Sequence, residues 1–208
     1  FIESLSHTRQ SINYPKLFNY LNYGYNSVSI DTKTFKKNII TIKPAKVYNI
    51  NNENIIQENE YWKPEIKEIN IKKIKKKEIY SEIRFKLKEA LKIRLRSDVK
   101  NIFCLSGGVD SGALVSIAAK EFNLNVNTFS IIDSFSKKNN EKELIEHTAR
   151  DVSAKKNYLF TENINLFSNL ENVIKYYQAP VLTVNYLLHA LMQKKISNLG
   201  YKVVLSGN

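Results

Sequence analysis

The run SGGVDS, at residues 106–111, combines the residue types that can hold a phosphate group. Gly107 and Gly108 allow the backbone to turn tightly and to approach a ligand closely. The two serine hydroxyls add hydrogen-bond donors, and Asp110 supplies a hard oxygen that can bind Mg²⁺ or position its water. The run is not a Walker A loop, because no lysine follows the glycines. A departing pyrophosphate therefore fits this loop better than a transferring γ-phosphate.

The segments on either side predict that the loop joins a buried strand to a helix. Residues 101–105 are mostly apolar, as in a strand covered on both faces, and residues 111–122 place Leu114, Ile117 and Phe122 on one face of a helix. The start of a helix directs unpaired N–H groups and a positive dipole end toward the loop, which favours an anion. A plain strand-to-helix turn is the alternative, but the combination of serine, glycine and aspartate argues against it.

The loop resembles the SGGxDS signature of the N-type ATP pyrophosphatases, the PP-loop enzymes. These enzymes split ATP between its α and β phosphates and adenylate a carboxylate, an amide or a base. The longer stretch from Arg94 to Gly112, RLRSDVKNIFCLSGGVDSG, resembles the synthetase domain of glutamine-hydrolysing asparagine synthetase. Residues 200–208, GYKVVLSGN, are similar to the GxKVVLSGEGxDE stretch of that family. The resemblance implies an ATP-dependent, amide-forming ligase that adenylates aspartate or another carboxylate and then transfers ammonia.

The same resemblance implies the ligands of the site and the residues that hold them. ATP and Mg²⁺ are the expected ligands, with Asp110 as a metal ligand and with Asp110 and Ser111 as catalytic residues. Pyrophosphate is expected to bind at the SGGVDS loop, and adenosine at the ends of the strands that contain Leu105, Ile131 and Ser206. The residues implied for nucleotide binding are Leu105, Ser106, Gly107, Gly108, Asp110, Ser111, Ile131, Ser206 and Gly207. The family usually has glycine where Ile132 stands.

Asn208 departs from the family, which carries a glutamate there that assists the amide-forming step. Asparagine cannot take a proton from an attacking ammonium ion. This departure keeps related amide synthetases open, such as β-lactam-forming, peptide-cyclising or sugar-amidating enzymes. A tRNA-modifying PP-loop enzyme and an inactive nucleotide-binding or scaffold protein are further alternatives. The family's second Mg²⁺-binding aspartate falls beyond Asn208, so this stretch alone is expected to be inactive.

From residue 79 onward, apolar strands alternate with helices, which predicts an α/β fold with a doubly wound parallel sheet. The resemblance makes this sheet similar to that of the adenine-nucleotide α-hydrolases. The end of the second strand should then lie beside the SGGVDS loop. The expected strands are 101–105, 126–132, 157–160 and 202–206. The expected helices are 79–96, 111–122, 141–154, 168–177 and 183–199.

Three parts are expected along the chain. Residues 1–62 contain a short helix after Pro15 and extended segments with a turn at 51–54, and this order resembles the α+β tail of a glutaminase domain. Residues 63–78 are lysine-rich and read as a linker. Residues 79–208 form the ATP-binding synthetase domain, incomplete at its C terminus. The family's glutaminase cysteine is missing from this sequence, so the nitrogen donor is expected to be glutamine, with that cysteine upstream of Phe1, or ammonia from another source.

The net charge of +12 raises the question of nucleic acid. Residues 71–100 carry twelve Lys or Arg and four Asp or Glu, a local charge of +8. Apolar residues recur in this stretch at four-residue spacing, so the lysines fall on the solvated face of an amphipathic helix. The expected partners therefore do not include nucleic acid. The apolar positions are Ile79, Ile83, Leu87, Leu91 and Leu95.

The remaining features are expected to be structural. Cys104, the single cysteine, lies in an apolar strand and reads as a small buried side chain. His7, His147 and His189 do not cluster, which favours surface or packing roles. Glu141 begins a helix, where it can act as a cap or balance the dipole. No run of the sequence has the length of a membrane span and no signal peptide is evident, so a cytoplasmic protein without a membrane partner is expected. The resemblance is compatible with a homodimer.

Overall fold

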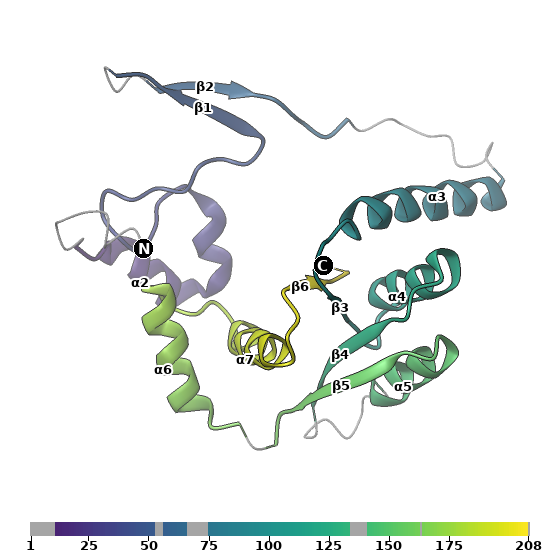
Figure 1. Ribbon diagram of the computed structural model, residues 1–208. Helices are drawn as coiled ribbons and strands as arrows, with labels where there is room; N and C mark the ends of the chain where they lie inside the picture. Colours follow the sequence, from purple (N-terminus) through teal and green to yellow (C-terminus); the bar gives the residue numbers. More distant parts are fainter. Residues whose placement is uncertain (1–10, 53–55, 66–74, 134–140, 163, 208) are drawn as a thin grey trace. The chain divides into compact units, whose positions relative to one another are not determined.

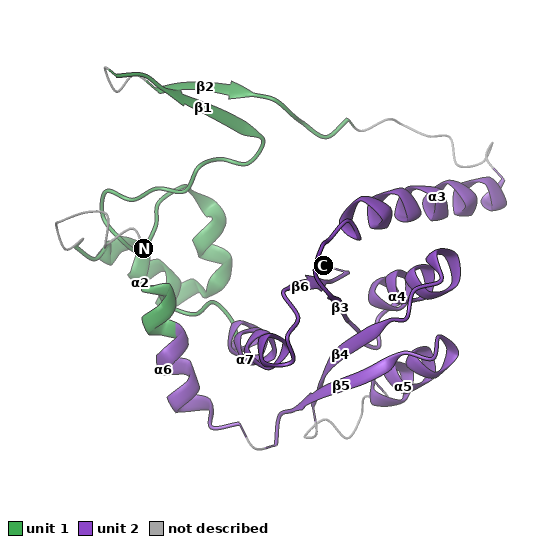
Figure 2. Ribbon diagram, viewed as in Figure 1, with its two compact units in different colours: residues 1–69, 174–183 green, residues 70–173, 184–208 purple. Residues whose placement is uncertain are grey.

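The chain separates into two compact units, shown in green and purple in Figure 2. Unit 1 comprises the described parts of residues 1–69 and 174–183, and unit 2 those of residues 70–173 and 184–208. The three-part division expected from the sequence stays a prediction. The computed structural model describes residues 11–52, 56–65, 75–133, 141–162 and 164–207.

Within its described residues, unit 2 is built on a four-stranded parallel sheet with the order β5-β4-β3-β6 (Figure 1). The chain adds β4 and β5 on one side of β3 and then returns to place β6 on the other side. This order confirms the doubly wound prediction, and the reversal between β3 and β6 is where such sheets bind ligands. The strands are β3 (Asn101–Cys104), β4 (Asn127–Ile132), β5 (Lys155–Phe160) and β6 (Val203–Leu205).

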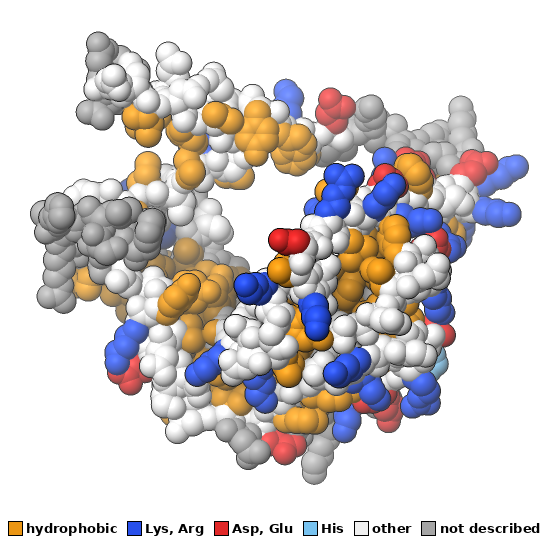
Figure 3. All heavy atoms as spheres, in the orientation of Figure 1, with side chains coloured by type: hydrophobic (Ala, Val, Ile, Leu, Met, Phe, Trp, Pro, Cys, Tyr) orange, Lys and Arg blue, Asp and Glu red, His pale blue; other side chains and the backbone are white. Residues whose placement is uncertain are grey.

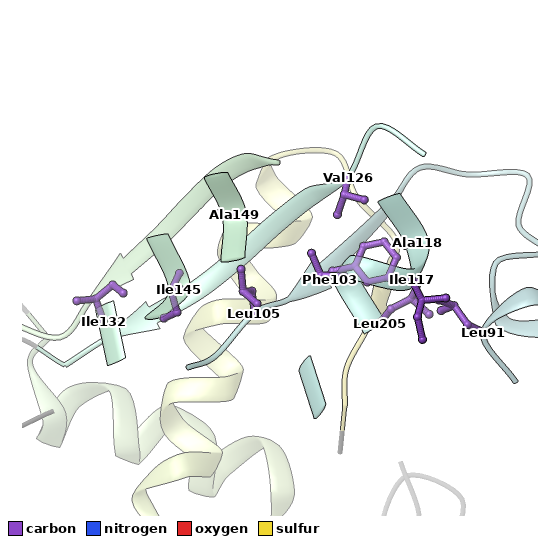
Figure 4. Packing of buried hydrophobic residues seen from close by; sticks show 11 residues of the cluster. Leu91, Phe103, Leu105, Ile117, Ala118, Val126, Ile132, Ile145, Ala149 and Leu205 are labelled. Carbon is purple, nitrogen blue, oxygen red and sulfur yellow. The ribbon is translucent and has the colours of Figure 1, made fainter. Parts of the chain in front are cut away.

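The sheet is covered on both faces because alternate residues of each strand point in opposite directions. Phe103 of β3 belongs to one apolar cluster, together with residues of α4 (Val109–Phe122) and α5 (Glu141–Asp151). Its neighbour Ile102 belongs to the other cluster, with Phe129 and with residues of α7 (Val184–Asn198). Figure 4 shows the first cluster at close range. The buried members of that cluster are Leu91, Phe103, Leu105, Val115, Ile117, Ala118, Val126, Ile132, Ile145, Ala149 and Leu205.

Helix α4 begins at Val109, two residues before the start predicted from the sequence. Asp110 therefore lies in the first turn of the helix rather than in the loop that precedes it. The helix ends at Phe122 and is capped by Asn123, which adopts the left-handed conformation (φ 52°) and donates its N–H to the carbonyl of Ala118. The second half of the SGGVDS run therefore belongs to α4.

Helix α3 (Lys76–Arg94) carries much of the positive charge, and Figure 3 shows basic side chains over it. Arg84 and Lys88 both pair with Glu121 of α4, so part of this charge is neutralised. The expected apolar stripe is buried only in part, since Leu91 is 2% exposed and Ile83 is 51% exposed. The remaining helix of this region, α6 (Leu166–Tyr177), spans the boundary between the two units.

Unit 1 contains α2 (Tyr14–Tyr23), the 3₁₀ helix η1 (Tyr25–Ile30) and a hairpin of β1 (Lys46–Ile50) and β2 (Ile56–Glu60). Helix α2 begins with Asn13, whose side chain accepts the N–H of Lys16, and with proline in the first turn. Tyr20 donates its hydroxyl to the carbonyl of Val181 at 2.8 Å, which links residues 174–183 to α2. The tip of the turn predicted at 51–54 lies outside the described residues, as does His7.

We find, among the described residues, no helix with the length and apolar character that crossing a bilayer requires.

Candidate functional site

The SGGVDS run forms the connection between β3 and α4 and is closed by the hydroxyl of Ser111. Ser111 Oγ accepts the N–H of Ser106 at 3.0 Å and lies 2.9 Å from Ser106 Oγ. It also lies 3.1 Å from the carbonyl oxygen of Ser106 and 3.2 Å from that of Gly108. Ser111 is 7% exposed. Its hydroxyl therefore holds the two ends of the loop together.

The glycines of the loop allow close contacts and do not adopt an unusual backbone conformation. Neither Gly107 nor Gly108 has a positive φ. A Cβ on Gly107 would lie 2.8 Å from Cγ of Glu141, and one on Gly108 would lie 3.3 Å from Oγ of Ser106. Gly207, which follows β6, approaches α4 in the same way, because its Cβ would lie 3.0 Å from Cβ of Asp110. The first turn of α4 and the end of β6 are thus packed directly against each other.

The N terminus of α4 is open to a ligand. Gly108 is its N-cap, and no side chain forms a capping hydrogen bond there. The N–H groups of a first helical turn and the positive end of the helix dipole favour an anion at such a position. The N–H of Gly108 itself is directed to Ser106 Oγ at 3.2 Å.

A cavity of about 800 Å³ lies at this junction, within unit 2. Its volume is in the range of ordinary small-ligand sites, about 300–1,000 Å³. Apart from Gly107, every residue predicted to bind nucleotide lines it. These residues are Leu105, Ser106, Gly108, Asp110, Ser111, Ile131, Ser206 and Gly207. Their roles in binding and catalysis stay predictions, and Asn208 lies outside the described residues.

The family model for asparagine synthase matches residues 82–208, which is more than half of the chain and includes the whole of this junction. The chain belongs to the asparagine synthase family. This finding confirms the family suggested by the SGGVDS and KVVLSG stretches, and it leaves residues 1–81 outside the match.

Solved structures give weaker likenesses. The NH3-dependent NAD synthetase from Campylobacter jejuni is 20% identical over 63% of this chain and 56% of that chain, with a TM-score of 0.39. A predicted subunit of tRNA methyltransferase from Methanocaldococcus jannaschii is 18% identical over 53% of each chain, with a TM-score of 0.33. The chain thus spans about half the length of these structures. Among curated proteins, none matches the chain.

In this member of the asparagine synthase family, one face of α7 also lines the cavity, which sequence reasoning missed. Asn185, Leu188, His189 and Met192 contribute to the lining. Their spacing of i, i+3, i+4 and i+7 is the signal of a single helical face. His189, for which a surface or packing role is expected, lies at the cavity wall, and its role stays a prediction. No sequence pattern indicated that this face of α7 meets the ends of β3 and β4.

Cys104 lies at the wall of the same cavity. It is partly buried against the second apolar cluster, and its Sγ lies 3.8 Å from Sδ of Met192. Burial raises the pKa of its thiol, so the nucleophilic thiolate is disfavoured. These contacts agree with the packing role expected from the sequence.

The lining is acidic. It includes the carboxylates of Asp110, Asp133, Glu141 and Glu162, and the described lining residues include neither lysine nor arginine. The described residues also hold no group of three or more His, Cys, Asp or Glu side chains placed to bind a metal ion. Mg²⁺ commonly binds through one or two carboxylates together with phosphate oxygens, so one or two carboxylates of this lining would suffice for a metal ion that arrives with a polyphosphate. Asp110 lies in the first turn of α4, and its role as a metal ligand stays a prediction.

Proposed function

We propose that the protein is an ATP-dependent ligase that forms an amide from a carboxylate and ammonia. The observation that carries this proposal is the junction of the SGGVDS loop with Ser206 and Gly207 at one cavity, between β3 and β6. The switch point of a doubly wound sheet, an open helix N terminus and two glycines that allow close approach together suit the pyrophosphate and adenosine parts of ATP. Membership of the asparagine synthase family supports the same reaction class.

The proposed reaction has two steps. A carboxylate oxygen of the substrate attacks the α-phosphorus of ATP, and the bond to the β-phosphate oxygen breaks as pyrophosphate leaves with the electron pair. Ammonia then attacks the acyl carbon, the bond to AMP breaks, and the nitrogen loses a proton. The backbone N–H groups at the start of α4 would stabilise the charge that develops on pyrophosphate. Mg²⁺, held by Asp110, would neutralise phosphate charge when bound.

Aspartate is the proposed carboxylate and glutamine the proposed source of ammonia. The support for glutamine is the order of sequence features in residues 1–62, which resembles the end of a glutaminase domain. Asn208 is a specific reason to keep a second product in view, namely the amide of another carboxylate. It follows directly on Ser206 and Gly207 of the cavity, where the family has glutamate.

The principal test is the role of Asp110 in nucleotide binding. We expect the full-length protein to bind ATP with Mg²⁺ in isothermal titration calorimetry, and Asp110→Ala to weaken that binding by roughly 10–100-fold. Asp98→Ala is the matched control, because Asp98 is exposed and lies outside the cavity lining. Absence of ATP binding, or equal binding by the Asp110 and Asp98 variants, would overturn the nucleotide assignment.

A second test addresses the product. Given ATP, Mg²⁺, glutamine and aspartate, the full-length protein is expected to release pyrophosphate but to form asparagine roughly 10²–10⁴-fold more slowly than Asn208→Glu, the usual size of a general base effect. Efficient asparagine formation by the unaltered protein would show that this position is not the base. If neither variant releases pyrophosphate in response to aspartate, the substrate is a different carboxylate.

A further inference from the structure

Glu141 reaches across from α5 onto the SGGVDS loop. Its Oε1 accepts the N–H of Gly107 at 3.3 Å. The side chain lies so close to the loop that a Cβ on Gly107 would come within 2.8 Å of its Cγ. Glu141 also lines the cavity, whereas Gly107 does not. The carboxylate thus covers one backbone donor of the loop.

A carboxylate on this N–H makes the same kind of contact as a phosphate oxygen. Both are anionic acceptors that form charge-assisted hydrogen bonds with backbone N–H groups near a helix N terminus. Gly107 has a single N–H, and the Glu141 side chain already occupies the space beside it. An incoming polyphosphate and Glu141 therefore compete for the same donor, and their like charges repel each other at short range.

We propose that Glu141 is an internal anion that occupies the pyrophosphate cradle and must leave the N–H of Gly107 when a polyphosphate binds. This inference rests on the proposed nucleotide function of the cavity. It assigns Glu141 an inhibitory role in binding, which is opposite to that of a metal ligand. When pyrophosphate leaves, Glu141 returns to the N–H and so favours product release.

The displaced carboxylate has a second favourable position in the same fold. Glu141 is the first residue of α5, and a negative charge in the first turn of a helix is stabilised by the helix dipole. Moving from the Gly107 N–H toward the N terminus of its own helix therefore keeps the carboxylate in a favourable field.

The experiment is titration of the full-length protein with pyrophosphate and with ATP, each in the presence of Mg²⁺. Glu141→Gln removes the charge and keeps the shape, and we expect it to bind pyrophosphate about tenfold more tightly than the unaltered protein. Glu141→Ala, which also uncovers the N–H, should bind at least as tightly. Glu143→Gln removes a charge from the same first turn, outside the cavity lining, and should change the dissociation constant by less than about twofold.

Two readouts separate competition from a structural role. The gain on Glu141→Gln should shrink as salt is raised, because it is electrostatic. The amide resonance of Gly107 should shift when Glu141 is changed to alanine and again when pyrophosphate is added, with the melting temperature of the ligand-free protein unchanged within about 2 °C. Weaker or unchanged pyrophosphate binding by Glu141→Gln would overturn this inference. If the protein still bound ATP, the proposed function would remain. Failure of every variant to bind either ligand would overturn both.

Discussion

The interiors of the two units differ in the kind of side chain that they bury. In unit 2 the best-buried side chains are apolar, and Ile102, Val115 and Ala118 are fully inaccessible. In the described part of unit 1, the buried residues are Lys16 and Ser27, while Ile30 is 80% exposed. The ammonium group of Lys16 donates to the carbonyl of Val28 at 2.8 Å and pairs with Asp31 at 2.7 Å.

This difference indicates that unit 2 has an apolar core of its own to stabilise it. Burial of apolar area contributes about 25 cal/mol per Å², and unit 2 has two apolar clusters that close both faces of a sheet. A buried lysine requires partners to offset its lost hydration, so the ion pair and hydrogen bonds of Lys16 add little net stability to unit 1. The site that needs fixed geometry lies in unit 2.

The largest expected effect is on the core of unit 2. Ile102→Ala should lower the free energy of unfolding of unit 2 by about 2–5 kcal/mol, because it leaves a cavity beneath β3. Ile30→Ala in unit 1 should change the free energy of unfolding by less than about 0.5 kcal/mol. Urea denaturation followed by hydrogen exchange of each unit's amides would measure both. Equal losses would show that unit 1 buries Ile30.

The next effect tests the close packing at the cavity. Gly207→Ala should lower stability by about 1–3 kcal/mol and weaken ATP binding, because its Cβ would lie 3.0 Å from both Cβ of Asp110 and the backbone nitrogen of Ser111. Gly112→Ala is the control within α4, since its Cβ would meet Thr148 at an ordinary 3.9 Å. That variant should be more stable by about 0.5–1 kcal/mol. Thermal melts and calorimetric titration would separate the two, and a tolerated Gly207→Ala would contradict the packing described above.

The polar centre of unit 1 should respond to a single charge. Asp31→Asn removes the carboxylate that pairs with buried Lys16, and we expect faster hydrogen exchange in α2 and η1 with no change in unit 2. The ion pair also lowers the pKa of Asp31, chiefly through its hydrogen bond with Lys16. Its contribution is therefore present above about pH 4 and is lost as the pH falls below it. Unchanged hydrogen exchange in α2 would mean that the backbone carbonyl partners of Lys16 are enough to stabilise its buried charge.

The smallest effect concerns an acid-sensitive pair in unit 2. The Lys156 ammonium, followed by the hydroxyl of Tyr158, lowers the pKa of Glu146. The carboxylate's contribution is present above about pH 4.5 and fades as the pH falls through the lowered pKa. Lys156→Met should cost less than about 1 kcal/mol at pH 7. The same substitution should make the free energy of unfolding fall less steeply as the pH drops below about 4.5, as measured by urea midpoints at several pH values. An unchanged slope would show that this pair does not contribute to the acid sensitivity of unit 2.

The sequence was most informative where local pattern and chemistry coincide. The apolar run before Ser106 and the helical spacing after it predicted β3, the loop and α4, and the beginning of α4 differed by two residues. The adjacency of β4 to β3 followed from the alternation of strands and helices. The position of α7 at the cavity could not be predicted, because it depends on how Met192 and Ile196 pack on the sheet. The contact of Glu141 with Gly107 was missed for the same reason, since 34 residues separate the two partners.

The pairing of β3 with β6 has a consequence for how the protein is made. Asn101 pairs with Val203, so β3 must wait for a strand that lies near the C-terminal end of the described residues. Closing so long a loop is entropically unfavourable, which makes the docking of β6 a late step. Until then β3 presents an unpaired, apolar edge of the kind that promotes aggregation. The docking of β6 therefore covers this edge of β3 in the same step that brings Gly207 against α4.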